Sequence, residues 1–338
     1  MPWPSLSIIV TSLNRASFIQ RTLLSILRQD YAGKVEVIVA DGGSTDGTVE
    51  VLKRYPQVTW WSGPDGGIVD AINKGLAQAT GEFVAVQDSD NYYLRDAFKL
   101  TLAAAREDPS LDIVTGCDIY LEPDGRTFVC SKLDDHAIDA RSLLMRRVIP
   151  IHCAFVRRRI VEAVGGFRPL ASLRKEVGGD VGNVGVDIDF WYRALHFVRG
   201  RFVSHHTAAY QRHPQMMSAN SPRWYANMTE MVERCEQYAR FGSRFKLSTE
   251  DKVNLFVRWE IQQSRIDGDE YRVRKLVERV ENDTQRYTDE TRAYLALHGF
   301  IASPIPKEPR KRHPNHKVPE LHWYMEPMRR AAATTEAA

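Results

Sequence analysis

Residues 82–93 read "EFVAVQDSDNYY", an apolar run that ends on two acids separated by one residue. A short apolar run bounded by polar residues is typical of a buried β-strand. We therefore expect a strand over 82–87, with Asp88 and Asp90 at its carboxyl end. Because residues two apart share one face of a strand, the pattern predicts that both carboxylates point to the same side.

The sequence before this stretch alternates short apolar runs with helical patterns. Strands are expected at 6–11, 35–40 and 58–61, and helices at 16–29, 48–55 and 66–80. This alternation predicts βαβ units and an α/β fold with a doubly wound, mostly parallel, Rossmann-like sheet. Ligands bind such sheets outside the carboxyl ends of the strands. Thr11, Asp41 and the Asp88/Asp90 pair follow three of these strands, so the sequence predicts a ligand site at one edge.

Composition excludes several other classes of protein. The 338 residues, 43% of them hydrophobic, can form a large core with a smaller appended unit. A net charge of +3 gives no global field of the kind that nucleic-acid-binding proteins use, so no nucleic-acid partner is expected. The four cysteines have no short repeated spacing, which argues against a zinc ribbon or a secreted disulfide framework and fits a reducing cytoplasm. No apolar run is long enough to predict a membrane span, and the N-terminal run is expected to be a strand rather than a signal peptide.

The chain divides into three expected parts: a catalytic domain at 1–220, a helical extension at 221–302 and a tail at 303–338. Within the first part, shorter strands are expected after residue 111, and glycines in 174–185 suit a lid over a ligand. The tail is basic and rich in proline, with an aromatic cluster. It suits peripheral contact with an anionic membrane, but a solvated tail or an oligomer contact is an open alternative.

Two common nucleotide-binding motifs are missing. The first strand-to-helix turn reads "TSLNRAS" (11–17), without the glycines of a dinucleotide-binding loop. The segment "NKGLAQAT" (73–80) lacks the pattern of a Walker phosphate loop. A dehydrogenase or a Walker-type nucleotidase is therefore not expected.

Four segments together resemble the family 2 glycosyltransferases of the GT-A fold. They are "SIIVTSLNRASFIQRTLLSILRQDY", "VIVADGGSTDGTVEVL", "SGPDGGIVDAINKGLAQATGEFVAVQDSDNYY" and "GGF" followed by "VDIDFWYRA". The resemblance implies a transferase of class EC 2.4 that moves a sugar, with inversion, from a nucleotide-diphosphate sugar to an acceptor hydroxyl. It further implies a glycan or lipid-linked acceptor in envelope or extracellular polysaccharide or glycolipid synthesis. The expected location is the cytoplasm, and the basic tail suits the inner face of the cytoplasmic membrane.

The resemblance also implies which residues hold the nucleotide sugar. They are Thr11, Asn14, Asp41, Asp70, Asn73, Lys74, Asp88, Ser89, Arg212 and His213. Plain structural roles are open for several: Asn14 could cap the following helix, and Asp70, Asn73 and Lys74 could form a solvated helix face. Asp46 or Ser44 is expected to cap the helix that begins at 48.

Metal binding is expected at Asp90, with Asp88 as the second candidate. Paired carboxylates suit Mg²⁺ or Mn²⁺, which bind a diphosphate alongside one or two acids. Relatives often carry two consecutive acids where this sequence reads Asp90-Asn91, so the second ligand stays open.

The resemblance places the general base at the start of the segment 186–194. Asp187 is the expected base and Asp189 its rival, while either could instead be an acid that stabilises the N-terminus of a helix. His152 is expected near the acceptor pocket. A non-catalytic nucleotide-sugar-binding protein and a glycoside hydrolase are the alternatives. Whether the nucleotide is UDP, GDP or dTDP, and which sugar and acceptor are used, is not determined by the sequence.

Overall fold

The computed structural model describes residues 1–129, 135–138, 149–168, 186–195 and 198–216, with positions 274, 277, 278, 281 and 282. The expected glycine-rich lid and the tail lie outside the described residues, as does the helical extension apart from those five positions. Among the described helices, none combines the length and apolar composition that crossing a membrane requires.

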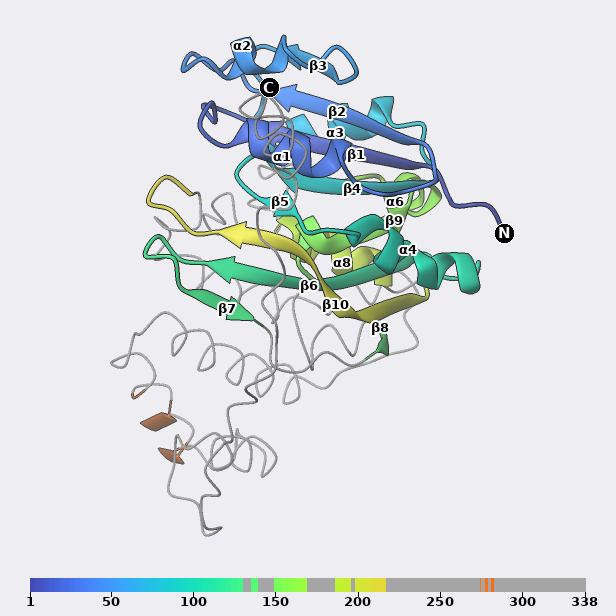
Figure 1. The fold of residues 1–338 in the computed structure, drawn as a ribbon. Coiled ribbons are helices and arrows are strands. Elements are labelled where there is room, and N and C mark those ends of the chain that lie inside the picture. The colour runs from blue at the N-terminus through green and yellow to red at the C-terminus, as the bar shows by residue number, and fades with distance from the viewer. Residues whose placement is uncertain are drawn as a thin grey trace, which may run out of the picture.

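The described elements form one mixed sheet with helices on both of its faces (Figure 1). The strands are β1 (Leu6–Ser12), β2 (Val35–Asp41), β3 (Thr59–Ser62), β4 (Phe83–Asp88), β5 (Tyr92–Tyr93), β6 (Ile113–Leu121), β7 (Thr127–Val129), β8 (His136–Ile138), β9 (Ala154–Arg157) and β10 (Gly200–Gln211). The helices are α1 (Ile19–Leu27), α2 (Thr48–Leu52), α3 (Ile68–Gln78), α4 (Ala97–Glu107), the 3-10 turn η1 (Ile151–Cys153), α6 (Arg158–Val164) and α8 (Val186–Leu195).

The parallel half of the sheet has the predicted architecture. Strands follow the order β3-β2-β1-β4-β9-β6-β10-β5, and the first four are mutually parallel. Ser12 pairs with Asp41 across β1 and β2, and Thr11 pairs with Asp88 across β1 and β4. The predicted meeting of these strand ends at one edge is therefore confirmed. We call this edge, where β1, β2 and β4 end, the carboxyl-end edge.

The other half of the sheet differs from the expectation of shorter strands. β6 has 9 residues and β10 has 12, and the two run parallel to each other. β9 lies between β4 and β6 and is antiparallel to both. The long strands were missed because buried polar side chains, including Thr115 and Thr207, interrupt their apolar pattern.

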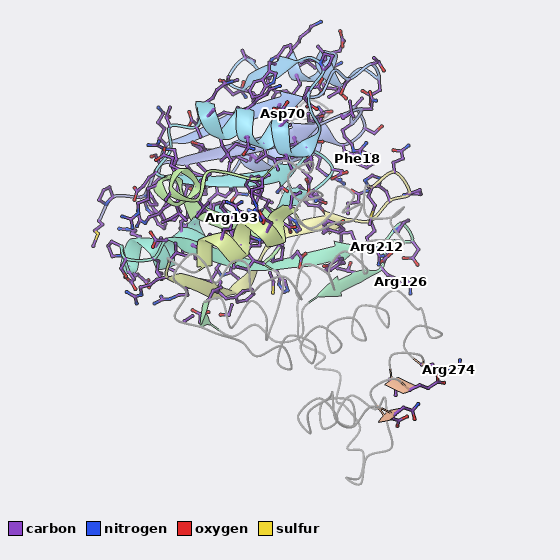
Figure 2. All side chains as sticks on the ribbon, turned by 180° about the vertical axis from the view of Figure 1, so that it is seen from behind. Phe18, Asp70, Arg126, Arg193, Arg212 and Arg274 are labelled. Carbon is purple, nitrogen blue, oxygen red and sulfur yellow. The ribbon has the colours of Figure 1, made fainter. Side chains whose placement is uncertain are left out.

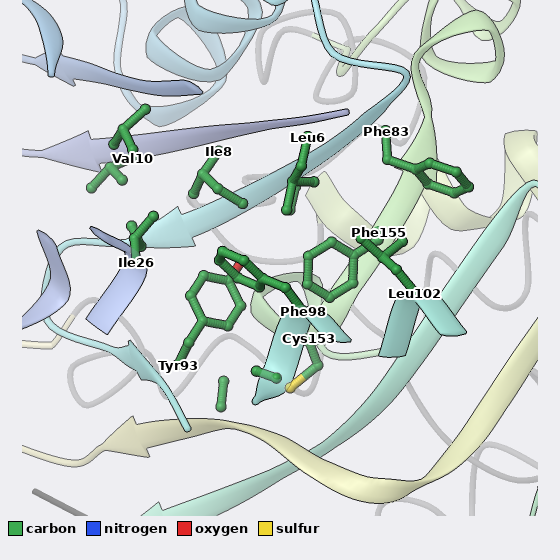
Figure 3. Close-up of a cluster of buried hydrophobic side chains, with 14 of the residues drawn as sticks. Leu6, Ile8, Val10, Ile26, Phe83, Tyr93, Phe98, Leu102, Cys153 and Phe155 are labelled. Atoms are coloured by element: carbon green, nitrogen blue, oxygen red, sulfur yellow. The ribbon is translucent and has the colours of Figure 1, made fainter. Parts of the chain in front are cut away.

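Alternate residues of β1 face opposite layers of helices. Leu6, Ile8 and Val10 belong to the core cluster that α1 and α4 cover, with Phe98 of α4 and Phe155 of β9 (Figure 3). On the other face, Ile9 meets α3 at Gly75, where an added Cβ would lie 2.5 Å from an Ile9 methyl group. Side chains on both faces of β1 are therefore buried, as is typical of a central strand in a parallel sheet.

Candidate active site

The turn after β2 is organised by Asp41, which is 1% exposed. Its Oδ2 accepts hydrogen bonds from the Ser44 backbone N–H (2.8 Å) and the Ser62 hydroxyl (2.6 Å). Asn14 fastens the same turn from the end of β1, because its Oδ1 accepts from the Thr45 N–H at 2.9 Å. Asn14 therefore holds this turn, and no side-chain cap is formed at the start of α1.

Neither Asp46 nor Ser44 caps α2, because Gly47 occupies the N-cap position and no side-chain cap is formed there; Asp46 instead fastens the turn before the helix. Its Oδ1 accepts from the Thr48 N–H at 3.0 Å, and its Oδ2 accepts from the Ala16 N–H at 3.0 Å. Ser44 instead donates to the carboxylate of Asp41. Hydrogen bonds thus join the segment 41–48 to the turn after β1, and the two segments lie together at the carboxyl-end edge.

The paired acids of the 82–93 stretch are not both on a strand. β4 ends at Asp88, and Ser89 and Asp90 lie in the turn that follows, so their relative direction is set by that turn. Ser89 is buried, and its backbone N–H donates to the Thr11 carbonyl at 3.2 Å. The expectation that the strand pleat aligns the two carboxylates was wrong, since the strand is shorter than that argument needs.

Asp88 and Asp90 have different surroundings. Burial, followed by the negative charge of Asp90, raises the pKa of Asp88 to about 6. Asp90 contacts two nitrogen-bearing side chains: its Oδ2 lies 3.1 Å from Arg15 Nε and 3.1 Å from His213 Nε2. Asn91 donates to Asp88 Oδ2 at 3.1 Å.

The end of β10 returns to this turn and delivers His213. The imidazole stacks on the Phe18 ring with a centroid separation of 4.7 Å. The Gln211 N–H donates to Asn91 Oδ1 at 3.0 Å, which fastens the two segments together. Arg212, by contrast, pairs with Glu122 at the end of β6 (3.1 Å), and Figure 2 labels Arg212 and Phe18 on the same side of the molecule.

The two candidate bases on α8 are placed differently. Asp187 and Asp88 are both half-buried, and the charge of Asp187 helps to raise the pKa of Asp88. Asp189 is 0% exposed and forms ion pairs with Arg168 and Arg193. The structure therefore brings Asp187, but not Asp189, into the electrostatic neighbourhood of Asp88.

His152 lies between the β4 end and the end of β6. Its Nε2 is 3.3 Å from Asp118 Oδ2, and its ring lies 5.4 Å from that of Tyr210. Burial alone would lower the pKa of His152, but Cys153 and Asp118 raise it well above its ordinary value. The positive charge of His152 in turn lowers the pKa of Asp88.

The three predicted residues of α3 do not act together. Asp70 accepts from the Gly66 N–H at 2.9 Å and pairs with Lys74 at 2.7 Å. Asn73 instead exchanges two hydrogen bonds with the backbone of Phe167, at 2.8 and 2.9 Å. Figure 2 labels Asp70 on the same face of the sheet as α8.

Comparison with known proteins identifies this arrangement. Residues 7–165 match the sequence profile described as Glycosyl transferase family 2. Residues 7–165 belong to this family. The match includes the Asp41 turn, the Asp88 and Asp90 pair and His152, whereas α8 lies beyond it.

Curated relatives match only part of this chain. Chondroitin synthase of Pasteurella multocida is 36% identical over 126 residues, which is 36% of this chain and 13% of that protein. A PGL/p-HBAD biosynthesis glycosyltransferase of Mycobacterium bovis is 30% identical over 173 residues, or 49% of this chain and 64% of that protein. The chain thus spans less than two thirds of the length of these relatives.

A solved structure matches over more of the chain. S. aureus TarS 1-349 in complex with UDP-GlcNAc superimposes with a TM-score of 0.56 at 19% identity, over 87% of this chain and 84% of that one. This likeness supports the GT-A-like fold, with its mostly parallel α/β sheet, beyond the segment that the family profile matches.

The donor set of the family 2 domain fits a hard divalent cation. In the described part of the chain, no three His, Cys, Asp or Glu side chains are grouped to hold a metal by themselves. Mg²⁺ and Mn²⁺ need only one or two carboxylates when phosphate oxygens and water complete the shell. Asp88 and Asp90 supply these, and a cation would stabilise the ionised Asp88 carboxylate, whose pKa is raised first by burial and then by the charge of Asp90.

Several site residues were missed by sequence reasoning. Arg15 and Phe18 contact Asp90 and His213 across the fold, and Arg15 is 75 positions from Asp90. No local pattern connects residues so far apart. Arg193 was within reach, because an acid and an arginine four residues apart face each other on a helix, as Asp189 and Arg193 do.

Proposed function

We propose that the family 2 domain transfers a sugar from a nucleotide-diphosphate sugar to an acceptor hydroxyl, with inversion at the anomeric carbon. One observation carries the proposal: Asp88 and Asp90, which suit a cation, are accompanied by a separate carboxylate, Asp187, whose charge helps to raise the pKa of Asp88. A transferase of this kind needs both a site for the leaving diphosphate and a base for the acceptor.

The donor nucleotide is proposed to lie against the Asp41 turn. Thr11, Asn14 and Asp41 come from adjacent strand ends, and the hydrogen bonds of the turn fix its shape before a ligand binds. UDP is our first choice of nucleotide, because the TarS structure was obtained with UDP-GlcNAc. Asp70 and Lys74 would border the same pocket from α3.

Asp90 and Asp88 are the residues that would hold Mg²⁺ or Mn²⁺. When bound, the cation would neutralise negative charge on the departing diphosphate. Arg15 and His213 meet Asp90 at 3.1 Å, and once a cation takes the Asp90 carboxylate they would be positioned to donate to phosphate oxygens at the same place. Arg212, which follows β10, pairs with Glu122, which follows β6.

Asp187 is proposed as the general base. Its carboxylate would accept the proton of the acceptor hydroxyl as that oxygen attacks the anomeric carbon. The acceptor would approach past His152 and the neighbouring rings of Tyr120 and Tyr210, whose centroids are 5.4 Å apart. Sugar rings pack well on such faces, and chondroitin synthase, a relative, is a polysaccharide enzyme by name. A glycan or a lipid-linked glycan is therefore the proposed acceptor.

Replacing Asp187 with Asn tests this proposal. Transfer is measured as UDP release from UDP-sugars with Mn²⁺ and a panel of oligosaccharide acceptors, and donor binding is measured by thermal shift. We expect Asp187→Asn to slow transfer about 1,000-fold while donor binding is retained. Full transfer by the variant would overturn the base assignment, and a wild-type protein that binds sugar nucleotides without turning them over would indicate a binding protein.

We further propose that the tail 303–338 contacts an anionic membrane at its cytoplasmic face, where lipid-linked acceptors would be met. The tail carries Lys307, Arg310, Lys311 and Arg312 in one short basic run. Flotation with anionic vesicles is expected to recover the full chain but not a chain that ends at residue 302. Equal recovery of both would remove this part of the proposal.

A further inference from the structure

Asp189, the rival base, lies in a closed network of ion pairs. Arg168 Nε donates to both of its oxygens, at 3.0 and 3.1 Å, and Arg193 Nε donates to Oδ2 at 2.9 Å. The carboxylate is 0% exposed. A base must come within hydrogen-bonding distance of the acceptor hydroxyl, and this buried, doubly paired group does not.

Arg193 carries the network from α8 to the turn after α6. Its two terminal nitrogens donate to the carbonyls of Val164 (2.5 Å) and Gly166 (2.8 Å). Gly166 has φ +70, and an added Cβ there would lie 2.7 Å from Asn73 Oδ1. Only glycine fits this turn without strain, so its carbonyl is presented to Arg193 in a fixed direction.

The same turn is fastened to α3 and to the body of α8. Asn73 exchanges two hydrogen bonds with the Phe167 backbone, and the Phe167 ring stacks on Phe190 at 4.5 Å with an interplanar angle of 9°. The contacts therefore run from α3, beside the proposed donor pocket, through the 164–168 turn, to the first turns of α8.

Resting on the proposed function, we propose that Asp189 is the positioning residue for Asp187. Residues two apart on a helix point about 200° apart. While Asp189 is held by Arg168 and Arg193 on one side of α8, Asp187 must face the other side, toward Asp88. The pairing thus fixes both the rotation of α8 about its axis and its distance from the donor side of the fold.

This role predicts an effect on the chemical step rather than on donor binding. A shift of the base by about 1 Å can slow a reaction about 100-fold, because the reacting atoms must be aligned. Asp189 touches neither the Asp41 turn nor the Asp90 pair in the described contacts, so the donor should bind as before.

The chain supplies a matched control at the opposite edge of the sheet. Asp112, 7% exposed, also lies between two arginines, 2.6 Å from Arg159 and 4.0 Å from Arg157. It precedes β6 and is far along that strand from the carboxyl-end edge. Asp112→Asn therefore removes a similar buried charge without touching α8.

The experiment compares Asp189→Asn, Asp187→Asn, the double variant and Asp112→Asn in the full chain. We expect Asp189→Asn to lower kcat about 100-fold with donor Kd unchanged within about twofold, and Asp112→Asn to keep kcat. In the Asp187→Asn background, Asp189→Asn should have no further effect on kcat, because the residue acts only through Asp187. A further loss in that background, or an unchanged kcat in the single variant, would overturn the inference.

A second variant and a second measurement cover the case in which Asp189→Asn does not fold. Arg193→Lys keeps a positive charge beside Asp189 but cannot reach Val164 and Gly166 together. We expect it to lower kcat about tenfold and to speed hydrogen exchange of the 186–195 amides, while Arg159→Lys changes neither. If hydrogen exchange rises in Arg193→Lys but the wild-type chain transfers no sugar, the proposed function fails, while the structural role of the Asp189 ion pairs stands. If transfer is normal in Arg193→Lys, the positioning role of Asp189 fails, while the proposed function stands.

Discussion

At the edge where β1, β2 and β4 begin, the Glu36 carboxylate is surrounded by hydrogen-bond donors, whereas at the carboxyl-end edge the Asp88 carboxyl lies in the field of a second acid, Asp90. Glu36, at the start of β2, accepts from the Ser7 hydroxyl and the Gly81 N–H. Burial alone would raise the pKa of Glu36, but these hydrogen bonds and those from Thr80 lower it. Asp88, at the end of β4, has a pKa raised to about 6 by burial and then by Asp90.

The difference separates stability from function within one sheet. A carboxylate with a lowered pKa stabilises the folded chain when ionised, whereas one with a raised pKa destabilises it. At the carboxyl-end edge, ionised Asp88 is disfavoured first by burial and then by the charge of Asp90, and a bound cation would relieve both. Perturbed groups of this kind are typical of functional sites, and the opposite edge provides the internal reference.

The largest expected effect is on transfer when the carboxyl-end edge is changed. Asp90→Asn removes the charge that Arg15, His213 and the proposed cation share. We expect kcat/KM for a UDP-sugar to fall about 100- to 1,000-fold. The change in melting temperature should be small, and normal turnover in Asp90→Asn would show that the paired acids do not serve the reaction.

The next largest effect is on folding, at the opposite edge. Asp112→Asn removes the buried charge that accepts from the exposed Arg159, and losing such a charged hydrogen bond costs about 2 kcal/mol of unfolding free energy. Urea unfolding measures the loss, and transfer assayed on the folded fraction should be unchanged. A reduced kcat in the folded protein would contradict the claim that this edge serves stability and the carboxyl-end edge serves transfer.

The third prediction is a gain in stability, where the Asp112 substitution gives a loss. Because the pKa of Asp88 is raised to about 6, the stability tied to its protonated form is present at low pH and lost as the pH rises through about 6. Without divalent cations, Asp88→Asn should therefore be more stable than wild type at pH 8, by about 1–2 kcal/mol. Unfolding curves at pH 4 and pH 8 measure this, and equal stability of the two proteins at pH 8 would contradict it.

The smallest effect is expected at Glu36. Its pKa is lowered, so its contribution is present above the ordinary pKa of a glutamate and is lost as the pH falls through its value in the folded state. Glu36→Gln should cost about 1 kcal/mol at pH 7 and reduce the acid sensitivity of unfolding. A variant as stable as wild type at pH 7 would mean that the Ser7 and Gly81 contacts contribute nothing measurable.

Sequence patterns were sufficient for the parallel half of the fold. The apolar runs before Thr11, Asp41 and Asp88 predicted three adjacent strand ends, and the register confirms it. They were insufficient for β6 and β10, because the core that buries Thr115 and Thr207 is built from distant segments.

The candidate site was predictable as a set of residue types and only partly as a geometry. The paired acids and the two candidate bases were visible, since each lies in one short stretch. That His213 meets Asp90 across 123 positions depends on the return path of β10, which no local pattern encodes. The choice between Asp187 and Asp189 likewise depends on Arg168 and the 164–168 turn.

Calorimetric titration with UDP-GlcNAc, with and without Mn²⁺, tests most directly whether the carboxyl-end edge holds a sugar nucleotide and a cation together. The account predicts binding by the wild-type chain that strengthens at least tenfold when Mn²⁺ is present, and no such gain for Asp90→Asn. If UDP-, GDP- and dTDP-sugars all fail to bind with Mn²⁺ or Mg²⁺, or if wild type and Asp90→Asn gain equally from the cation, the central claim is contradicted.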